Sequence, residues 1–596
     1  MSSLPLLRWG FMLSLAAVAL AFLLRPDLKH NINNHAHAIL QHSFSSSSSE
    51  DQTYCYEGVR TSHAPGSEAV SSSVTCFNVH DGKFTSVFTP LETDSVIVSP
   101  GHAYPGFWDG HGHLLQYGEF LHSVNLFGSK SFDEVRSRVT DYVDTHPGAG
   151  GRDEWVRGVG WDQMALGEMP TADMLEAEPR LQGLYIMLDR VDVHCIWVSK
   201  AVLSLLPADL PDVPGGEIVR HPGMGVFCDN AMEMVTAVWP RPGAEKKKEY
   251  VRSAMKDLHS VGLVGMHDAG VTPRELSLYE EMATTEGDGW SLRVYAMIEC
   301  AERNTFCPEA VQKVETDNGM LHVRSVKLFA DGALGSWGSA MLEPYSDRPD
   351  TTGSLLVNAS TLTALTNSWA AAGYQVNIHA IGDRANRLAI DAFESTLKNL
   401  CPSTPGNEQD LRACQLENYR FRIEHSQIIH PSDQVRMRDL GVIPSVQPTH
   451  ATSDSAYAGL RLGVERLQKE AYRMQSIWDL GPVLGSDFPV EPANPFAGIY
   501  AAVTRRRPDT GVAGPPGSNG GWCVDEALEF SQALAGFTEA PARGAFLEGS
   551  AGRIQPGFWA DWIVLESKLE DISVDEVRNV KVKETWVGGR KVFDRE

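Results

Sequence analysis

The stretch Phe107-Trp108-Asp109-Gly110-His111-Gly112-His113 follows a Pro-Gly turn and decides how the rest of the chain is interpreted. On an extended backbone, residues two positions apart point to the same side. His111 and His113 can therefore aim two imidazoles at one point, as metal ligands do. A His-x-His pair also arises by chance in solvated segments, so the prediction depends on further ligand candidates elsewhere in the chain.

Strand and helix patterns alternate through the middle of the chain, which predicts a parallel sheet covered by helices. Helical patterns lie between most of the strand candidates, for example over 246–260 and 386–398. The eight strand candidates are 107–109, 264–268, 293–298, 324–329, 375–379, 421–425, 443–447 and 483–487. Eight strands in this order predict an α/β fold of the (β/α)8 TIM barrel type. A doubly wound open sheet is the alternative, but no glycine-rich phosphate loop follows any strand.

The domain organisation follows from the spacing of these strands. The gap between the first and second strands is too long for a loop, so a large insertion with its own structure is expected at about 115–250. The barrel with this insertion spans 105–545. Short β-like segments in 53–104 and 546–596 predict one composite β-sandwich, built from both ends of the chain.

The N-terminal segment has no charged residue between Arg8 and Arg25. It is short for a membrane span, which needs about 20 apolar residues, and long for the core of a signal peptide. We expect residues 1–25 to form an uncleaved transmembrane signal-anchor, with cleavage and secretion as the alternative. Residues 26–52 are polar and serine-rich and predict a low-complexity stem.

Composition and cysteine usage limit the partners and the compartment. A net charge of −25 argues against nucleic acid and against binding through anionic lipid surfaces. Nine cysteines include two closely spaced pairs, Cys300 with Cys307 and Cys401 with Cys414, which suit disulfides in an oxidising compartment. The sequon at Asn358 is compatible with exposure there. The barrel is therefore expected in the lumen of the secretory pathway or outside the cell.

Polar residues recur where the predicted barrel strands end, and this is where the catalytic residues of such barrels lie. His111 and His113 follow the first strand, and Lys327 interrupts the apolar fourth strand. The remaining candidates are His379 in the fifth strand, His425 in the sixth and Asp487 in the eighth. Each has an ordinary structural explanation when taken alone, but six at one end of a barrel predict a site.

These residue types indicate a zinc-like centre, because imidazole and carboxylate suit borderline divalent metals. His111, His113 and Asp487 are expected to hold one metal, and His379 and His425 a second. Burial lowers the pKa of a lysine, so Lys327 could react with carbon dioxide and bridge both metals as a carbamate. A metal-activated hydroxide would then attack a polarised carbonyl, with Asp487 moving the proton to the leaving nitrogen.

The chain resembles the amidohydrolase superfamily, in particular the YtcJ-like branch of amidohydrolase family 3, to which N-substituted formamide deformylase belongs. The resemblance extends from about residue 53 to the C-terminus. It is carried by the stretch 105–113, by Val326-Lys327-Leu328-Phe329-Ala330-Asp331-Gly332-Ala333-Leu334-Gly335-Ser336, by His379-Ala380-Ile381-Gly382-Asp383, by Arg422-Ile423-Glu424-His425, by Gly485-Ser486-Asp487-Phe488-Pro489-Val490 and by Gly557-Phe558-Trp559-Ala560-Asp561. Trp108 is a departure, because an aliphatic residue is more usual there.

The resemblance implies a hydrolase that acts on a small molecule at a carbon–nitrogen bond other than a peptide bond, an amide or a formamide. One or two zinc ions and a carboxylated Lys327 would be its cofactors, and a homodimer is left open. The alternatives are an ester, lactone or cyclic imide as substrate, or a barrel with a regulatory role and no catalysis.

Further polar residues are expected around the metals. Arg190, Asp192, His194 and Trp161 in the insertion resemble segments that face the active site in this branch, which implies contact with substrate. A salt-linked turn within the insertion would explain the same residues. His267, Asp268 and Asp331 follow barrel strands and are expected to support the metal ligands.

Overall fold

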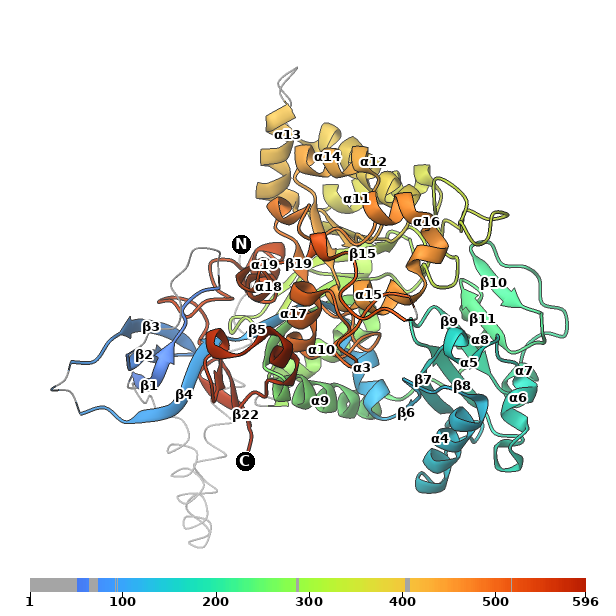
Figure 1. The fold of residues 1–596 in the computed structure, drawn as a ribbon, viewed down its shortest axis with the longest axis horizontal. Helices are drawn as coiled ribbons and strands as arrows, with labels where there is room; N and C mark the ends of the chain where they lie inside the picture. The colour runs from blue at the N-terminus through green and yellow to red at the C-terminus, as the bar shows by residue number, and fades with distance from the viewer. Residues whose placement is uncertain are drawn as a thin grey trace, which may run out of the picture. The chain divides into compact units, whose positions relative to one another are not determined.

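Eight parallel strands form a nearly closed barrel in the computed structural model, and helices cover it (Figure 1). The barrel strands are β5 (Phe107–Gly112), β12 (Leu263–Val271), β13 (Arg293–Ile298), β15 (Leu321–Phe329), β16 (Gln375–Ala380), β17 (Arg422–His425), β18 (Ile443–Val446) and β19 (Val483–Leu484). Each neighbouring pair from β5 to β19 is parallel. All eight strands predicted from the sequence are therefore present.

The structure describes residues 51–63, 73–91, 93, 95–285, 289–401, 408–515 and 517–596. The predicted anchor at 1–25 and all but the last two residues of the predicted stem lie outside this part. Among the described residues, no helix has the length and apolar character that crossing a membrane requires. The description below concerns the unit Thr53–Glu596.

The first and last barrel strands meet at a glycine. Asp487 N–H donates to the carbonyl of His111 at 2.7 Å, and His113 N–H donates to the carbonyl of Phe488 at 3.0 Å. A Cβ at Gly485 would lie 2.5 Å from the backbone nitrogen of His111, so only glycine lets the chains come this close. The buried Asp109 carboxylate strengthens the junction, because it accepts from the amide and the hydroxyl of Ser486.

Helices follow most of the barrel strands. The longer ones are α9 (Ala244–Ser260), α10 (Pro273–Thr285), α11 (Ala359–Ala371), α12 (Asp383–Leu400), α14 (Pro431–Leu440), α16 (Ala458–Lys469) and α17 (Pro495–Thr504). Shorter ones are α3 (Leu114–Leu121), α13 (Glu408–Cys414), α15 (Pro448–Ser453), α18 (Phe530–Gly536) and α19 (Glu539–Gly544). Their apolar faces cover the outer faces of strands that are almost wholly buried, as in other parallel sheets.

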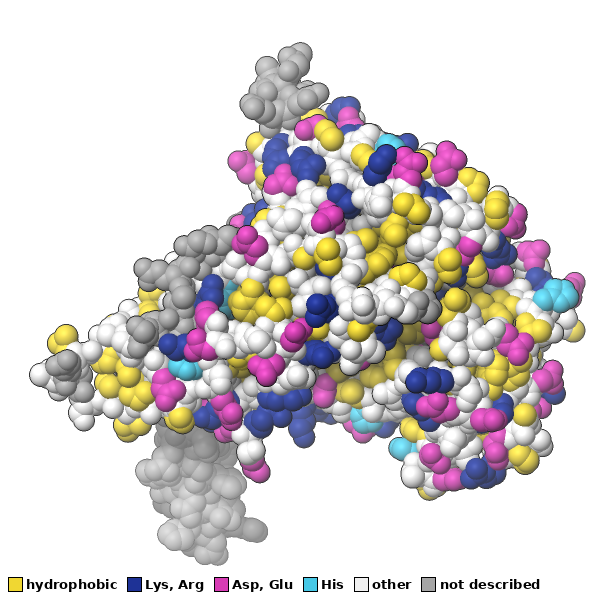
Figure 2. Space-filling view, in the orientation of Figure 1, with side chains coloured by type: hydrophobic (Ala, Val, Ile, Leu, Met, Phe, Trp, Pro, Cys, Tyr) yellow, Lys and Arg dark blue, Asp and Glu magenta, His cyan; other side chains and the backbone are white. Residues whose placement is uncertain are grey.

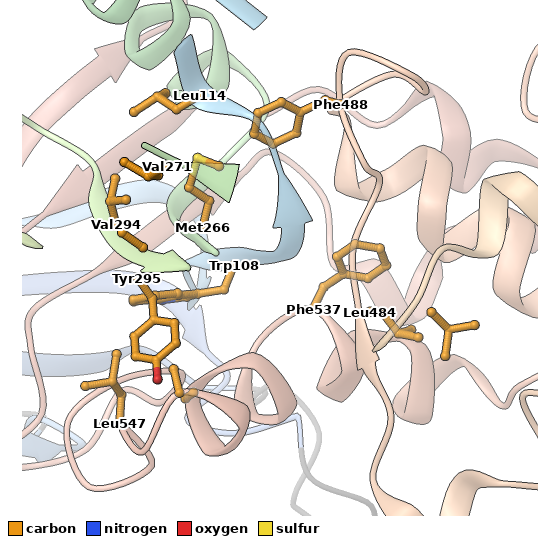
Figure 3. Packing of buried hydrophobic residues seen from close by; sticks show 14 of the residues in the cluster. Trp108, Leu114, Met266, Val271, Val294, Tyr295, Leu484, Phe488, Phe537 and Leu547 are labelled. Atoms are coloured by element: carbon orange, nitrogen blue, oxygen red, sulfur yellow. The ribbon is translucent and has the colours of Figure 1, made fainter. Parts of the chain in front are cut away.

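The core of the barrel is continuous with its helical cover (Figure 3). Trp108 is fully buried beside Gly265, where a Cβ would lie 2.5 Å from the indole. Its bulk is thus accommodated by the absence of a side chain on the neighbouring strand. The departure from the family pattern at Trp108 is a matter of packing, and it does not involve His111 or His113.

A second sheet of six strands lies in the chain between β5 and β12. Its order is β10-β11-β9-β8-β7-β6, and it has a core of its own around Trp161 and Trp197. The strands are β6 (Val124–Asn125), β7 (Val156–Trp161), β8 (Ile186–Arg190), β9 (Cys195–Val198), β10 (Gly216–Val219) and β11 (Val226–Asp229), with helices α4 (Phe132–Thr145), α5 (Gln163–Leu166), α6 (Ala172–Glu176), α7 (Lys200–Leu203) and α8 (Met232–Thr236). These residues fall within the segment where the sequence predicts an insertion.

The two ends of the chain share a third sheet. Its order is β22-β21-β20-β4-β1-β2-β3, in which β4 pairs with β20 in antiparallel fashion. The strands are β1 (Gln52–Val59), β2 (Thr75–His80), β3 (Lys83–Phe88), β4 (Val98–Pro105), β20 (Trp562–Leu565), β21 (Glu584–Val587) and β22 (Arg590–Asp594). The sequence predicts one composite β-sandwich from both ends of the chain. The two ends do pair, and their described strands form one continuous sheet that is joined through β4 and β20.

Four disulfides cross-link the chain. Cys300 bonds to Cys307 and Cys401 to Cys414, which confirms both closely spaced pairs. Cys55 bonds to Cys76 between β1 and β2, and Cys195 bonds to Cys228 between β9 and β11. On the face shown in Figure 2, acidic and basic side chains are interspersed over the surface.

Candidate metal centre

Three of the predicted ligands converge where β5, β17 and β19 end. His111, His425 and Asp487 each offer one ligand atom, and these atoms lie within 4.8 Å of one another. His113 joins them, with its Nε2 3.0 Å from Oδ1 of Asp487. The carboxylate of Asp487 thus faces both histidines of the opening motif, and the barrel brings three distant segments of the chain together at this point.

Lys327 and His379 complete the group from β15 and β16. Nζ of Lys327 lies 3.4 Å from Nε2 of His111, and the rings of His379 and His425 are 4.5 Å apart between centroids. Burial lowers the pKa of Lys327, despite the attraction of Glu424 and Asp487 for its charged form. The structure therefore places all six predicted ligands near one another, and His111, His425 and Asp487 form the tightest group among them.

Glu424 fixes the orientation of His111. Nδ1 of His111 donates to the Glu424 carboxylate at 2.6 Å, which leaves Nε2 directed at the cluster. Arg422 donates to both oxygens of Glu424, at 2.8 and 3.0 Å, and all three side chains are buried. A buried carboxylate that holds the far nitrogen of a histidine is the usual support for a metal ligand.

The residues predicted to support the ligands have distinct surroundings. His267 contacts Arg422 through Nδ1 at 2.7 Å, so it belongs to the chain of contacts behind His111. Asp331 accepts three backbone N–H donors, from Ala340, Ile381 and Gly382, and lies 3.6 Å from Nε2 of His379. Asp268 accepts from the hydroxyl of Tyr279 at 2.9 Å.

The cluster opens into a cavity of about 1150 Å³. The barrel contributes His113, Lys327, His379, His425 and Asp487 to its wall, and the insertion contributes Asp192, His194 and Asp229. His194 lies close to the cluster, with its ring 5.7 Å from that of His379. The insertion therefore forms one wall of the cavity and the metal-ligand candidates another.

The four insertion residues predicted to contact substrate fall into two groups. Asp192 and His194 line the cavity, whereas Arg190 is buried and donates from Nε to Asp192 at 2.8 Å. Trp161 is fully buried in the core of the insertion, where its Nε1 donates to the carbonyl of Leu188. The prediction that Trp161 contacts substrate is wrong, because its indole packs against Trp197 in the core of the insertion, whereas its neighbours Gly160 and Asp162 line the cavity.

Among the cavity-wall residues that the sequence did not predict, His450 and Gln427 lie beside the predicted ligands. His450 lies at the start of α15, directly after the seventh barrel strand, with Nε2 3.7 Å from Oδ2 of Asp487. Gln427 follows His425 by two residues and contacts Nδ1 of His450 at 3.4 Å. The seventh strand itself contains no residue of a type that binds metal. The one sequence signal for His450 was therefore that it closely follows a barrel strand.

The donor atoms suit a divalent cation. Burial lowers the pKa of His111, His379 and His425 well below the ordinary value, so each ring is neutral and offers a lone pair. Burial disfavours the charged form of Asp487, but His111 and His113 outweigh it and hold the pKa of this carboxyl below its usual range. Nε2 of His379 is buried and has no hydrogen-bond partner among the described residues. A cation at the cluster would satisfy this atom.

Comparison with known proteins agrees with this architecture. The chain is 30% identical over 506 residues to Protein LONG AFTER FAR-RED 3 of Arabidopsis thaliana, with 82% of each chain covered. It is 26% identical to the putative amidohydrolase YtcJ of Bacillus subtilis, with 85% of this chain and 91% of that protein covered, and 24% identical to N-substituted formamide deformylase of Arthrobacter pascens, with 84% and 89% covered.

A solved structure shares the fold. An uncharacterised metal-dependent hydrolase from Pyrococcus horikoshii superposes with a TM-score of 0.66 at 24% identity, covering 88% of this chain and 99% of that one. The profile of the amidohydrolase family matches residues 101–593, which include every barrel strand and every ligand candidate. The chain therefore belongs to the amidohydrolase family, within the YtcJ-like branch of amidohydrolase family 3.

Proposed function

We propose that this protein is a metal-dependent hydrolase that cleaves a carbon–nitrogen bond other than a peptide bond, in a small amide or formamide. The observation that carries the proposal is the convergence of His111, His425 and Asp487, of which His425 and Asp487 line a large cavity. The relative from Arthrobacter pascens is an N-substituted formamide deformylase, which supports an amide as the bond class.

Six residues would hold the metal: His111, His113, Lys327, His379, His425 and Asp487. We propose one or two zinc ions, with a second ion depending on carboxylation of Lys327. A divalent cation bound there would lower the pKa of a water molecule and polarise the substrate carbonyl. Burial lowers the pKa of Lys327 and so supports its modification, since only the free amine reacts with carbon dioxide.

The chain's own residues supply orientation and proton transfer. Asp487 is ionised and lies between His113 and His450, so its carboxylate can accept a proton from the attacking water. The same carboxylate then delivers the proton to the leaving nitrogen, which departs as an amine while the carbonyl carbon becomes a carboxylic acid. His194 and Asp192 line the insertion wall of the cavity and would contact the rest of the substrate.

The test is hydrolysis by the full-length protein of a panel of N-formyl and N-acyl amines, lactones and cyclic imides. We expect amide turnover that a chelator abolishes and zinc restores, with one to two zinc-like ions per chain by elemental analysis. Asp487→Asn should retain the fold, and most of the metal, yet lose at least about a thousandfold in kcat. A folded, metal-free and inactive wild-type protein would exclude the proposal. Preferential turnover of lactones or imides would change the bond class alone.

We also propose that the barrel lies in an oxidising compartment of the secretory pathway, held by the N-terminal segment or released after its cleavage. Four disulfides support this location, since such bonds rarely persist in reducing compartments. Asn358 is exposed at the N-terminus of α11, where an oligosaccharide has room. Glycosidase treatment of the secreted or membrane fraction should reduce the mass of the protein, and Asn358→Gln should remove that change.

A further inference from the structure

The disulfide between Cys195 and Cys228 lies directly beneath two residues of the cavity wall. Cys195 opens β9 and Cys228 is the third residue of β11, and the two cysteines are direct partners in the antiparallel ladder. His194 precedes the first cysteine and Asp229 follows the second. Because neighbouring residues on a strand point to opposite sides, the disulfide faces the core of the insertion while His194 and Asp229 face the cavity.

His194 and Asp229 contact each other twice. The amide of Asp229 donates to the carbonyl of His194 at 2.9 Å, and Nδ1 of His194 lies 2.8 Å from Oδ1 of Asp229. These contacts lie at the end of the β9–β11 ladder, where the segment before His194 and the segment after Asp229 leave the sheet. The ends of short strands open more readily than their centres, so such a pair needs an additional constraint to keep one geometry.

The backbone beside His194 and Asp229 adopts strained conformations, which makes an additional constraint on the pair more important. Val193 and Asp229 both have positive φ, at 52° and 51°, a conformation that costs energy in residues with a side chain. The amide of His194 donates to Asp192, whose carboxylate Arg190 holds. The covalent bond between the next residues keeps the two backbones at a fixed separation and so maintains this arrangement.

The opposite side of Asp229 rests on the barrel. A Cβ at Gly332 would lie 2.8 Å from Oδ1 of Asp229, so the loop that follows Lys327 is shaped around this carboxylate. The glycine belongs to the motif Ala330-Asp331-Gly332 that follows β15. The pair is therefore confined from two sides, by the disulfide within the insertion and by the glycine loop on the barrel.

We propose that the Cys195–Cys228 disulfide is a positioning element of the active site, which holds His194 and Asp229 against the substrate opposite the metal ligands. Its catalytic consequence rests on the proposed function, whereas its structural consequence does not. Loss of the bond leaves the fold and the metal ligands in place, because neither cysteine contacts the cluster, but it lets the pair move. A displacement of about 1 Å at such a position can cost up to a hundredfold in rate.

The first experiment measures backbone amide exchange by mass spectrometry and needs no substrate. In Cys195→Ser/Cys228→Ser, the segments 192–196 and 227–231 should exchange faster than in the wild-type protein, while β5 and β17 remain unchanged. The matched control is Cys401→Ser/Cys414→Ser, which removes a bond at the end of α12 and should leave these segments unaffected. Equal exchange in the wild-type protein and in the Cys195/Cys228 variant overturns the proposal.

The second experiment measures the coupling between the disulfide and His194. The Cys195/Cys228 variant and His194→Ala should each lower kcat/KM about tenfold or more, and the triple variant should be no worse than His194→Ala, because both changes disable the same pair. Zinc content should stay at the wild-type value. Additive losses, or an unchanged kcat/KM in the Cys195/Cys228 variant, contradict positioning. Absence of hydrolysis in the wild-type protein counts against the proposed function, and amide exchange then decides the positioning role.

Discussion

Glu424 accepts a hydrogen bond from Nδ1 of His111 at 2.6 Å, with both side chains fully buried. The contact fixes the ring so that its other nitrogen faces Asp487 and Lys327. Arg422 in turn neutralises the carboxylate, which makes an otherwise costly buried charge tolerable. The orientation of His111, a residue of β5, therefore depends on Glu424 of β17.

Glu424→Gln should weaken metal binding without unfolding the protein. The amide keeps the size of the side chain but loses the charge that holds Nδ1–H, so zinc affinity should fall by about ten- to a hundredfold. Competition with a chromophoric chelator measures the affinity, and circular dichroism checks the fold. Glu465→Gln, which breaks an exposed ion pair with Lys469, is the control and should bind zinc as the wild type does. Equal zinc affinity in both variants would show that Glu424 does not support metal binding.

The charge of the cavity should select among substrates. Its wall carries eleven carboxylate side chains and five lysine or arginine side chains. Matched N-formyl amines with a carboxylate, a neutral or an ammonium tail should therefore differ in kcat/KM, with the carboxylate the poorest by about tenfold or more. The difference should shrink as the salt concentration rises, because ions screen the field. A carboxylate tail that is favoured at low salt would contradict this prediction.

His259 should make the stability of the protein depend on pH. Nδ1 of His259 contacts the carbonyl of Leu263 and Nε2 contacts the hydroxyl of Ser291, an arrangement that suits the neutral ring. Burial lowers the pKa of His259 to about 4 from its ordinary 6.5. The unfolded chain therefore takes up a proton below pH 6.5 while the folded protein does not. The stabilisation is complete above pH 6.5 and is lost as the pH falls towards 4.

Between pH 7 and pH 5, this histidine should contribute a loss of roughly 2 kcal/mol in the free energy of unfolding. Urea titrations at both pH values measure the loss. His259→Gln retains a donor and an acceptor but does not titrate, so its loss should be smaller by that amount. His146→Gln replaces an exposed histidine and should behave as the wild type. The same loss in the wild type and in His259→Gln would rule out the assignment.

The barrel and the terminal sheet should depend on one buried ion pair. Arg293 on β13 donates to both oxygens of Asp561 at 2.6 and 2.9 Å and lies over the ring of Trp559. Arg293→Met leaves a buried carboxylate without its cation, which should lower the free energy of unfolding by about 3–5 kcal/mol. Thermal unfolding measures the change. Adding Asp561→Asn should recover part of the loss, and a double variant worse than the single one would contradict the pairing.

Much of the barrel could be predicted because its strands are buried on both faces and read as short continuous apolar runs. Against that background Lys327 and His379 stand out, and their places at strand ends predict a shared site. The exception is the seventh strand, whose ligand-type residue, His450, follows Pro448 at the start of a helix. A helical start gives no alternation from which the direction of a side chain can be inferred.

The insertion was harder to interpret because its contacts are not local. Trp161 and Asp192 both lie at strand ends beside glycine or charged residues, yet one is buried in the core and the other faces the cavity. The difference depends on which strands pair, and pairing across the segment 195–228 has no sequence signal beyond the two cysteines. The sequence likewise predicts that the two β-rich chain ends pair with each other, but not which strands, β4 and β20, make the junction.

The pairing of β4 with β20 determines when, during synthesis, the terminal sheet can be completed. After Pro105 has emerged from the ribosome, the whole barrel must still be translated before Trp562 emerges, which takes on the order of a minute. Throughout that time the nascent chain has an unpaired β4 edge that can recruit other strands. Newly made protein therefore needs protection for as long as translation lasts, and a stop codon near residue 555 leaves that edge exposed for the lifetime of the product.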